Sequence, residues 1–415
     1  MTLEFEKVVP QVERMGRMLE HRNITLSQRA QQAWDRFDEL LGDLQAVRAR
    51  IALVRERDAG FRGAAPPDDI NEPITRAYPL PPLPPRATLL AADGSQIYPD
   101  HHAPALYYLI NVGVFIYHHG LDALPEEFIE PQLHYEDSAL RDKHGHLVTN
   151  ATVNARRTIQ ELHILRREAW ARRDQPFPLL ALTDGPLLWW ANKDIADGPK
   201  LEKEYFGHLM SFHDLRAEMR NRHDQPVALL GYVDRPSSAF LVSLVHLMSL
   251  AKEAVQTPYL HTNGEFEGVE DSALMRRLLG PGERSAIMVQ QSPTNKAYHE
   301  RGENYEIAFF YLHVGTKSRF HLARVEIPMW VARDRQAVDT VHALLYAQCE
   351  IMWRYPYALT RADELAVVRG HEKQHLSQMI ELRLRQNAQR VEYSQKQASK
   401  SVRHGRKSYR GPRRQ

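Results

Sequence analysis

Two aspartates, each placed directly after a short apolar run, are the residues of this sequence best suited to chemistry. Asp93 follows Ala87 to Ala92, Asp184 follows Pro178 to Thr183, and glycine comes after each aspartate. Such runs predict central strands buried on both faces, so both carboxylates should emerge at one edge of a sheet. A turn is the ordinary explanation of one Asp-Gly pair, but two at equivalent strand ends favour a binding site.

Carboxylates held close together repel each other at neutral pH, and a bound cation is a common remedy. Their hard oxygen atoms favour magnesium or manganese over zinc. A third acid should come from the helix between the two strands, where Glu161 and Glu168 lie two turns apart on nearly the same face. A solvated helix charge is the alternative for each glutamate. Three carboxylates around two metal ions would activate water for phosphodiester hydrolysis.

Alternating strand and helix patterns predict the elements that must position these acids. In order they are three strands, a helix, a strand, a helix, a strand and a helix, which is an α/β arrangement. These elements are expected at 87–92, 106–117, 128–135, 148–172, 178–184, 200–221, 227–233 and 237–253. Two more strands, a helix and a highly charged helix are expected at 306–314, 321–331, 336–352 and 360–396.

Composition divides the chain into five segments. Apolar residues at helical spacing predict a helical hairpin arm over 1–62, and eight prolines make 63–85 a linker. An α/β domain over 86–363, a helix over 364–395 and a basic tail over 396–415 follow. The single cysteine, Cys349, excludes an intrachain disulfide framework and a thiolate zinc cluster. Since no long apolar segment or signal peptide is evident, we expect a cytoplasmic protein without a membrane partner.

The net charge of +2 is unevenly distributed. Eight lysines and arginines but no acid lie in 396–414, and removing these eight charges from +2 leaves −6 on the rest of the chain. Nucleic acid must therefore bind through local patches or through this tail. The candidate contacts in the tail are Arg403, Arg406, Lys407 and Arg410. A solubilising end is the alternative explanation of the tail.

A second metal motif competes with the acids. His371-Glu372-Lys373-Gln374-His375 fits the His-Glu-x-x-His pattern of a zinc protease helix. This helix is charged nearly all round, whereas a zinc site needs a dry, shaped cavity, so a solvated helix face is favoured. A glycine-rich phosphate loop with Lys-Ser/Thr and a Gly-x-Ser-x-Gly elbow are both absent from the sequence, which argues against an ATPase and a serine hydrolase.

Short motifs in a shared order make the segment from about Ala87 to Asp363 resemble the NurA family of DNA-repair nucleases. The first is Ala92-Asp93-Gly94-Ser95, and the second is Arg157 followed by Glu161-Leu162. The later ones are Thr183-Asp184-Gly185-Pro186-Leu187, Gly231-Tyr-Val-Asp-Arg-Pro236, Arg324-Val-Glu-Ile-Pro328, and Tyr355-Pro356 with Leu359 and Ala362.

The resemblance implies an RNase H-like mixed sheet flanked by helices. It also implies manganese- or magnesium-dependent 5′-to-3′ exonuclease and single-strand endonuclease activity in DNA end resection and double-strand-break repair. The implied assembly is a homodimer working with a hexameric HerA-type ATPase. By position, Asp93, Glu161 and Asp184 match the family's metal-binding acids, with two ions per site, and Tyr355 matches its late tyrosine. Asp363 stands where the family usually has histidine.

Three questions stay open after the resemblance. Arg324 is expected to guide the DNA strand, with a structural ion pair to Glu326 as the alternative. A catalytically impaired adaptor of the same fold, docking on a DNA translocase, is the alternative to an enzyme, because Asp363 cannot act as a cationic phosphate contact. An enzyme of this fold that cuts RNA or a hybrid is a third interpretation.

Overall fold

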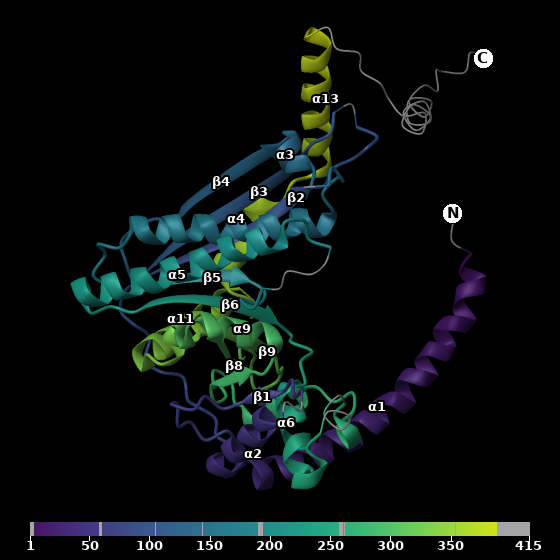
Figure 1. The fold of residues 1–415 in the computed structure, drawn as a ribbon, viewed down its shortest axis with the longest axis vertical. Helices are drawn as coiled ribbons and strands as arrows, with labels where there is room; N and C mark the ends of the chain where they lie inside the picture. The colour runs from purple at the N-terminus through teal and green to yellow at the C-terminus, as the bar shows by residue number, and fades with distance from the viewer. Residues whose placement is uncertain are drawn as a thin grey trace, which may run out of the picture.

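A mixed sheet of nine strands forms the framework of the described part of the chain (Figure 1). The computed structural model describes residues 4–387, apart from 58–59, 104, 143, 190–193, 257–259, 261 and 353. The strand order is β1-β7-β8-β9-β6-β5-β2-β3-β4. The strands are β1 (Ala64–Ala65), β2 (Ala87–Ile97), β3 (Tyr108–His119), β4 (Glu126–His134), β5 (Leu179–Asp184), β6 (Val227–Asp234), β7 (Met288–Gln290), β8 (Ile307–His313) and β9 (Leu322–Pro328).

The half of the sheet that carries the predicted acids runs from β4 to β6. β2, β3 and β4 are antiparallel neighbours, whereas β5 and β6 run parallel to β2. One helix precedes each parallel strand, α4 (Asn150–Ala171) before β5 and α5 (Gly198–His223) before β6. This arrangement agrees with the RNase H-like mixed sheet predicted from the sequence, and it packs its own apolar core between the strands and helices.

The other half of the sheet carries a second core. The last part of α1 (Phe5–Leu41), α2 (Leu44–Glu56), α6 (Phe240–Ser249) and α8 (Asp271–Leu278) pack there, with Phe37 and Leu41 among the buried residues. β9 pairs antiparallel with β6, so both cores share one continuous sheet. No helix in the described ranges combines the length and apolar character required to cross a membrane.

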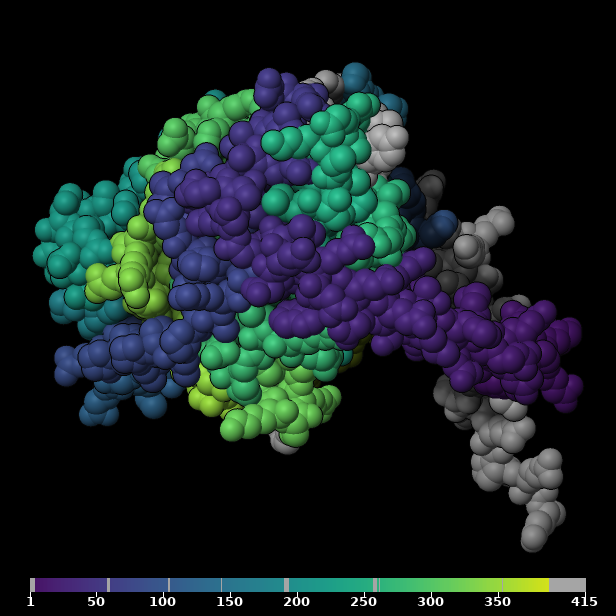
Figure 2. All heavy atoms as spheres, turned by 90° about the horizontal axis from the view of Figure 1, so that it is seen from below, coloured from purple at the N-terminus to yellow at the C-terminus, as the bar shows by residue number. Residues whose placement is uncertain are grey.

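The two helical extensions project from the body (Figure 1). α1 is 37 residues long, and α2 begins after Asp43, whose carboxylate accepts the N–H groups of Gln45 and Ala46. Side chains along the first half of α1 are exposed, and Figure 2 shows this half standing clear of the body. At the other end, α13 (Gly370–Gln386) has no buried residue.

The long C-terminal helix predicted from residue 360 is present but divided in two. α12 (Tyr357–Ala366) packs on β2 and β3, and α13 starts after a break at 367–369. The carbonyl of Ala366 accepts the side-chain N–H of Asn111 at 2.7 Å and the hydroxyl of Ser95 at 2.5 Å. Because these side chains from the sheet satisfy the last carbonyl of α12, the helix ends there.

Two predicted strands have different bounds in the structure. β2 continues through Asp93 to Ile97, because β3 pairs with it along its whole length, so Asp93 lies within a strand and not in a turn. The strand expected at 321–331 ends at Pro328, which has no N–H to extend the ladder, and α10 (Met329–Ala332) follows. α11 (Arg335–Ile351) matches its prediction. Short elements were not predicted: β1, β7, α3 (Asp137–Leu140), α8, α9 (Pro293–Arg301), η1 (Lys252–Ala254), η2 (Gly264–Phe266) and η3 (Glu303–Tyr305).

Replacement of Gly113 tests how tightly α12 docks on the sheet. A Cβ at position 113 would lie 2.4 Å from the Ala362 carbonyl oxygen and 2.6 Å from the Ala366 nitrogen, both backbone atoms. We expect Gly113→Ala to lower the free energy of unfolding by about 1–3 kcal/mol, measured by urea denaturation. The control is Gly207→Ala in α5, where a Cβ meets no atom within 4 Å. That variant should gain up to about 1 kcal/mol, and equal effects would contradict the docking.

Candidate active site

Asp93 and Asp184 lie at the point where β2 and β5 separate. The parallel pairing of these strands ends at Ala92 and Thr183, so the two aspartates come one residue later and start on the same face. Burial and the charges of Asp184 and Asp363 together raise the pKa of Asp93 to about 6, against the opposing N–H of Gly94 and charge of Arg157. Burial also raises the pKa of Asp184. The structure therefore brings the two predicted aspartates together.

Glu161 reaches the same edge from the opposite face of the sheet. Gly113, the register partner of Asp93, faces α12, so the Asp93 side chain starts on the α12 face. Gly94 faces α4 instead, and a Cβ there would lie 2.5 Å from the Glu161 Oε1. Position 94 must therefore stay free of a side chain for the Glu161 carboxyl to occupy the rim.

The Glu161 carboxyl is buried and incompletely paired. Its Oε1 has no hydrogen-bond partner, although the Nε of Arg157 lies 3.4 Å away. Burial raises the pKa of Glu161 to about 8; Arg157 opposes this, and the charges of Asp93 and Asp184 add to it. Arg157 also donates to the Gly94 carbonyl at 2.8 Å, which holds α4 against β2. A buried carboxyl that is incompletely paired and lies beside two other acids suits a bound cation.

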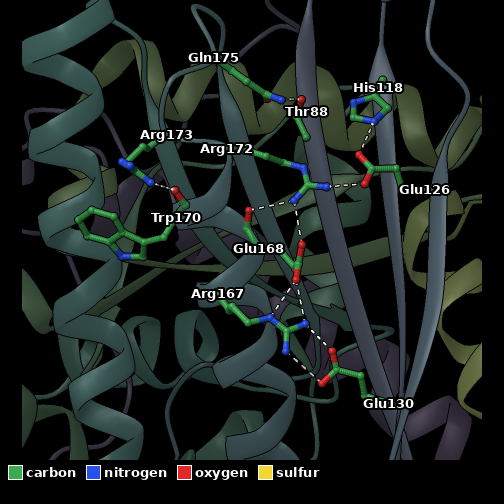
Figure 3. A network of polar contacts seen from close by, with 10 residues as sticks. All are labelled: Thr88, His118, Glu126, Glu130, Arg167, Glu168, Trp170, Arg172, Arg173 and Gln175. Atoms are coloured by element: carbon green, nitrogen blue, oxygen red, sulfur yellow. Dashed lines mark hydrogen bonds and ion pairs between the residues drawn. The ribbon is translucent and has the colours of Figure 1, made fainter.

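Glu168, the other candidate on α4, is committed to a different network (Figure 3). Its carboxylate accepts from Arg167 at 2.8 Å and from Arg172 at 2.9 Å. The same arginines bind acids of β4, Arg172 to Glu126 at 2.6 Å and Arg167 to Glu130. Glu168 therefore helps to tie α4 to the outer strand β4, away from the aspartates. The structure favours Glu161 as the third acid.

Tyr355 and Asp363 complete the group predicted from the sequence. The Tyr355 hydroxyl donates to the Asp184 Oδ1 at 2.8 Å, and its ring packs edge-on against Tyr232 at 5.2 Å. Burial and the charge of Asp184 raise the pKa of Tyr355, so the phenol stays protonated. Asp363 is exposed on α12, and its charge raises the pKa of both Asp93 and Asp184. The five predicted site residues therefore gather at one edge of the sheet.

Asp234 is a member of this group that the sequence analysis missed. It is the last residue of β6, and its charge raises the pKa of Asp184. Its Oδ1 lies 2.5 Å from the Nε2 of His321. A third apolar run ending in an acid, 227–233 followed by Asp234, was the available signal.

The predicted contacts to DNA have mixed outcomes. Arg324 binds Glu326 at 2.8 Å, and Glu326 also accepts the N–H of Leu187 at 2.9 Å, which favours the structural ion pair. The tail residues Arg403, Arg406, Lys407 and Arg410 lie outside the described residues.

In the rival zinc motif, His371 and His375 are exposed on α13, and Glu372 accepts the N–H of Arg369.

The acids suit a hard cation in type but do not form a finished cage. Among the described residues, no three His, Cys, Asp or Glu side chains are grouped so that they could hold a metal ion as they stand. The acids approach from two faces, so a cation would have to draw them together. A cavity of about 840 Å³ is lined by α2, α9 and neighbouring residues such as Met329, and none of these acids lines it.

Comparisons with known proteins give one family match and similar solved structures. A family model described as the NurA domain matches residues 87–368. The crystal structure of the NurA nuclease from Sulfolobus solfataricus is similar, with a TM-score of 0.50 and 12% identity over 92% of this chain and 98% of that chain. Human ENDOV has a TM-score of 0.29 and 13% identity, covering 79% of this chain and 99% of that chain. No curated protein sequence matches the chain.

The raised pKa of Glu161 predicts how stability depends on pH without metal. Between about pH 4.5 and 8 the unfolded carboxyl is ionised, whereas the folded carboxyl keeps its proton. Since the folded state binds more protons, the free energy of unfolding should fall as pH rises through this window. Urea denaturation in chelator at pH 5, 6, 7 and 8 measures this slope. Glu161→Gln should flatten it, and an unchanged slope would contradict the burial of an ionisable carboxyl there.

Proposed function

Since the chain belongs to the NurA family, we propose that it is a divalent-metal-dependent deoxyribonuclease whose ions are held by Asp93, Glu161 and Asp184. The family match and the similar NurA nuclease support a nuclease role. The observation that carries the proposal is the gathering of these acids at the edge where β2 and β5 separate, with Asp93 and Asp184 raising the pKa of Glu161.

Each residue of the site has a definable task in phosphodiester hydrolysis. Bound ions would activate a water molecule and neutralise the leaving oxygen. Tyr355 keeps its proton and donates it in a hydrogen bond to Asp184, which fixes the orientation of that carboxylate. Arg157 donates a hydrogen bond to the Gly94 carbonyl and lies 3.4 Å from the Glu161 carboxyl, which holds α4 against β2. Asp363 adds negative charge at the exposed side of the same edge.

The finer properties of the activity rest on the resemblance. They are manganese or magnesium as the metal, two ions per site, 5′-to-3′ exonuclease and single-strand endonuclease activity, and action on DNA ends in resection with a HerA-type hexameric ATPase. The basic tail is proposed as an additional DNA contact. One observation favours the adaptor alternative: the described acids do not form a metal cage as they stand.

A homodimer is supported by an apolar stripe on the free half of α1. Phe5, Val9, Val12, Met15 and Leu19 lie three or four residues apart, and each side chain is exposed. A helix places residues at this spacing on one face. An exposed stripe of this kind marks a surface that another chain covers, and a second copy of α1 offers the matching stripe.

The nuclease proposal is tested with end-labelled single-stranded DNA, duplex DNA and RNA, each with manganese, magnesium or chelator. We expect metal-dependent cleavage of DNA that falls by about 100-fold or more in Asp93→Asn, because the site loses a charge that holds the metal. Glu161→Gln should behave in the same way, whereas Glu168→Gln should retain activity. The exposed Asp122 provides a matched control as Asp122→Asn.

The outcomes separate the alternatives. Cleavage that survives Asp93→Asn would point to a contaminant or to another site. A parent protein that binds DNA but cuts neither DNA nor RNA would favour the adaptor, and cleavage confined to RNA would overturn the choice of substrate.

The dimer is tested by placing charge in the apolar stripe. We expect the double variant Val12→Glu, Met15→Glu to sediment as a monomer, because both side chains are about half exposed in the single chain and would face each other across the dimer. Arg17→Glu, on the opposite face of α1, is the control and should stay dimeric. Sedimentation velocity decides, and a dimer that survives the double variant would exclude this surface.

A further inference from the structure

The edge of the sheet beside the acids carries a second arrangement of charged residues, built around Asp234. In the parallel pair of β5 and β6, Asp184 is the register partner of Tyr232. Asp234 lies two residues further along β6, so its side chain starts on the same face as that of Asp184. Its charge raises the pKa of both Asp184 and Tyr355, which puts it within electrostatic range of the site.

Two cationic or protonatable side chains contact Asp234. Ala323 of β9 is its register partner, so His321, two residues earlier, lies on the same face. The His321 Nε2 is 2.5 Å from one carboxylate oxygen, and the Arg235 Nε is 3.6 Å from the other. The His321 side chain is only 13% exposed, whereas that of Arg235 is 71% exposed. Asp234 thus holds one covered ring and one guanidinium open to an incoming ligand.

The backbone of Arg235 is held in an uncommon conformation. Its φ is +42°, in the left-handed region that residues other than glycine rarely adopt. Pro236 follows, and a residue before proline ordinarily prefers an extended backbone. The N–H of Arg235 donates to the Leu322 carbonyl at 3.1 Å, which fixes the turn against β9. Strain of this kind persists where the surroundings enforce it and is typical of ligand-binding sites.

Three other arginines near the acids, Arg157, Arg324 and Arg361, are paired and less exposed than Arg235. Arg157 binds the Gly94 carbonyl and lies against Glu161, and Arg324 is paired with Glu326. Arg361 is paired with Glu127 and Glu364. A phosphodiester approaching Asp93, Asp184 and Asp363 would meet repulsion from these carboxylates unless positive charge lies beside them.

Resting on the nuclease function proposed above, we propose that Arg235 and His321 form the phosphate-binding side of the site. In this arrangement the exposed Arg235 guanidinium binds a non-bridging oxygen of the nucleic-acid backbone, and Asp234 and the covered His321 are positioning residues that hold it. The acids of β2, β5 and α12 would lie on one side of the bound nucleic-acid strand. The β6–β9 pair would contact the phosphates of that nucleic-acid strand on the other side. This assigns a binding role to the motif Gly231-Tyr-Val-Asp-Arg-Pro236, which the metal site does not use.

The test measures binding apart from cleavage. In an Asp93→Asn background, the affinity for single-stranded DNA is measured in chelator over a series of salt concentrations. We expect Arg235→Ala to weaken binding about tenfold and to reduce the salt slope by about 0.7, the value for one lost phosphate contact. Arg235→Lys should restore much of the slope, because it keeps the charge. Arg335→Ala is the matched control, since that side chain on α11 is 94% exposed.

His321 and Asp234 are tested in the cleaving protein. We expect His321→Ala to raise KM for DNA more than it lowers kcat, and Asp234→Asn to reproduce this effect. The double variant should be no worse than Asp234→Asn alone, because His321 acts through Asp234, which it contacts. A purely structural role would change the stability without this split between KM and kcat.

The two proposals fail in different ways. If the parent does not cleave DNA but Arg235→Ala still flattens the salt slope of binding, the nuclease function is wrong and the phosphate contact stands. If the parent cleaves and Asp93→Asn abolishes cleavage, while Arg235→Ala and His321→Ala leave binding, salt slope and KM unchanged, the phosphate-binding side is overturned. Absence of any DNA binding overturns it as well.

Discussion

Repulsion between carboxylates gathered at one sheet edge is the constraint on which this structure depends. Asp93, Asp234 and Asp363 each lie within electrostatic range of Asp184, and Glu161 adds a buried carboxyl from the other face. The fold tolerates this charge by three means: it keeps protons on the buried acid, donates the Tyr355 hydroxyl to Asp184, and sets His321 against Asp234. A cation would relieve the remainder, which is why the metal-free site stores energy that ligand binding can release.

The sequence was sufficient for the elements around the site and for β8 and β9, and insufficient for the short strands β1 and β7. The runs before Asp93 and Asp184 are apolar on both faces, which identifies central strands, and the long helices α4, α5 and α11 were predicted close to their observed bounds. β1 and β7 have only two and three residues, too few for any periodicity to appear. The division between α12 and α13 depends on Asn111 and Ser95, which are more than 250 residues distant in sequence, so no local pattern could reveal it.

The same limit applies to the candidate site. Strand ends predicted that Asp93 and Asp184 would meet, because parallel neighbours finish at a common edge. Spacing alone left Glu161 and Glu168 open, since both lie on nearly the same face of α4, and only the resemblance favoured Glu161. The structure separates them by the arginines that Glu168 binds (Figure 3). His321 could not be found from the sequence at all, because its contact with Asp234 arises from the antiparallel register of β6 and β9. Contacts that depend on strand pairing cannot be predicted until the register of the strands is known.

The missing side chain of Gly94 leaves the space that the Glu161 carboxyl occupies beside β2. The acid on α4 reaches the aspartates of the sheet through the space where a side chain would otherwise stand. Competence for a three-acid site therefore depends on a position that contributes no ligand atom. A related chain could retain Asp93, Glu161 and Asp184, yet alanine or serine at position 94 would still displace the Glu161 carboxyl from this edge of the sheet.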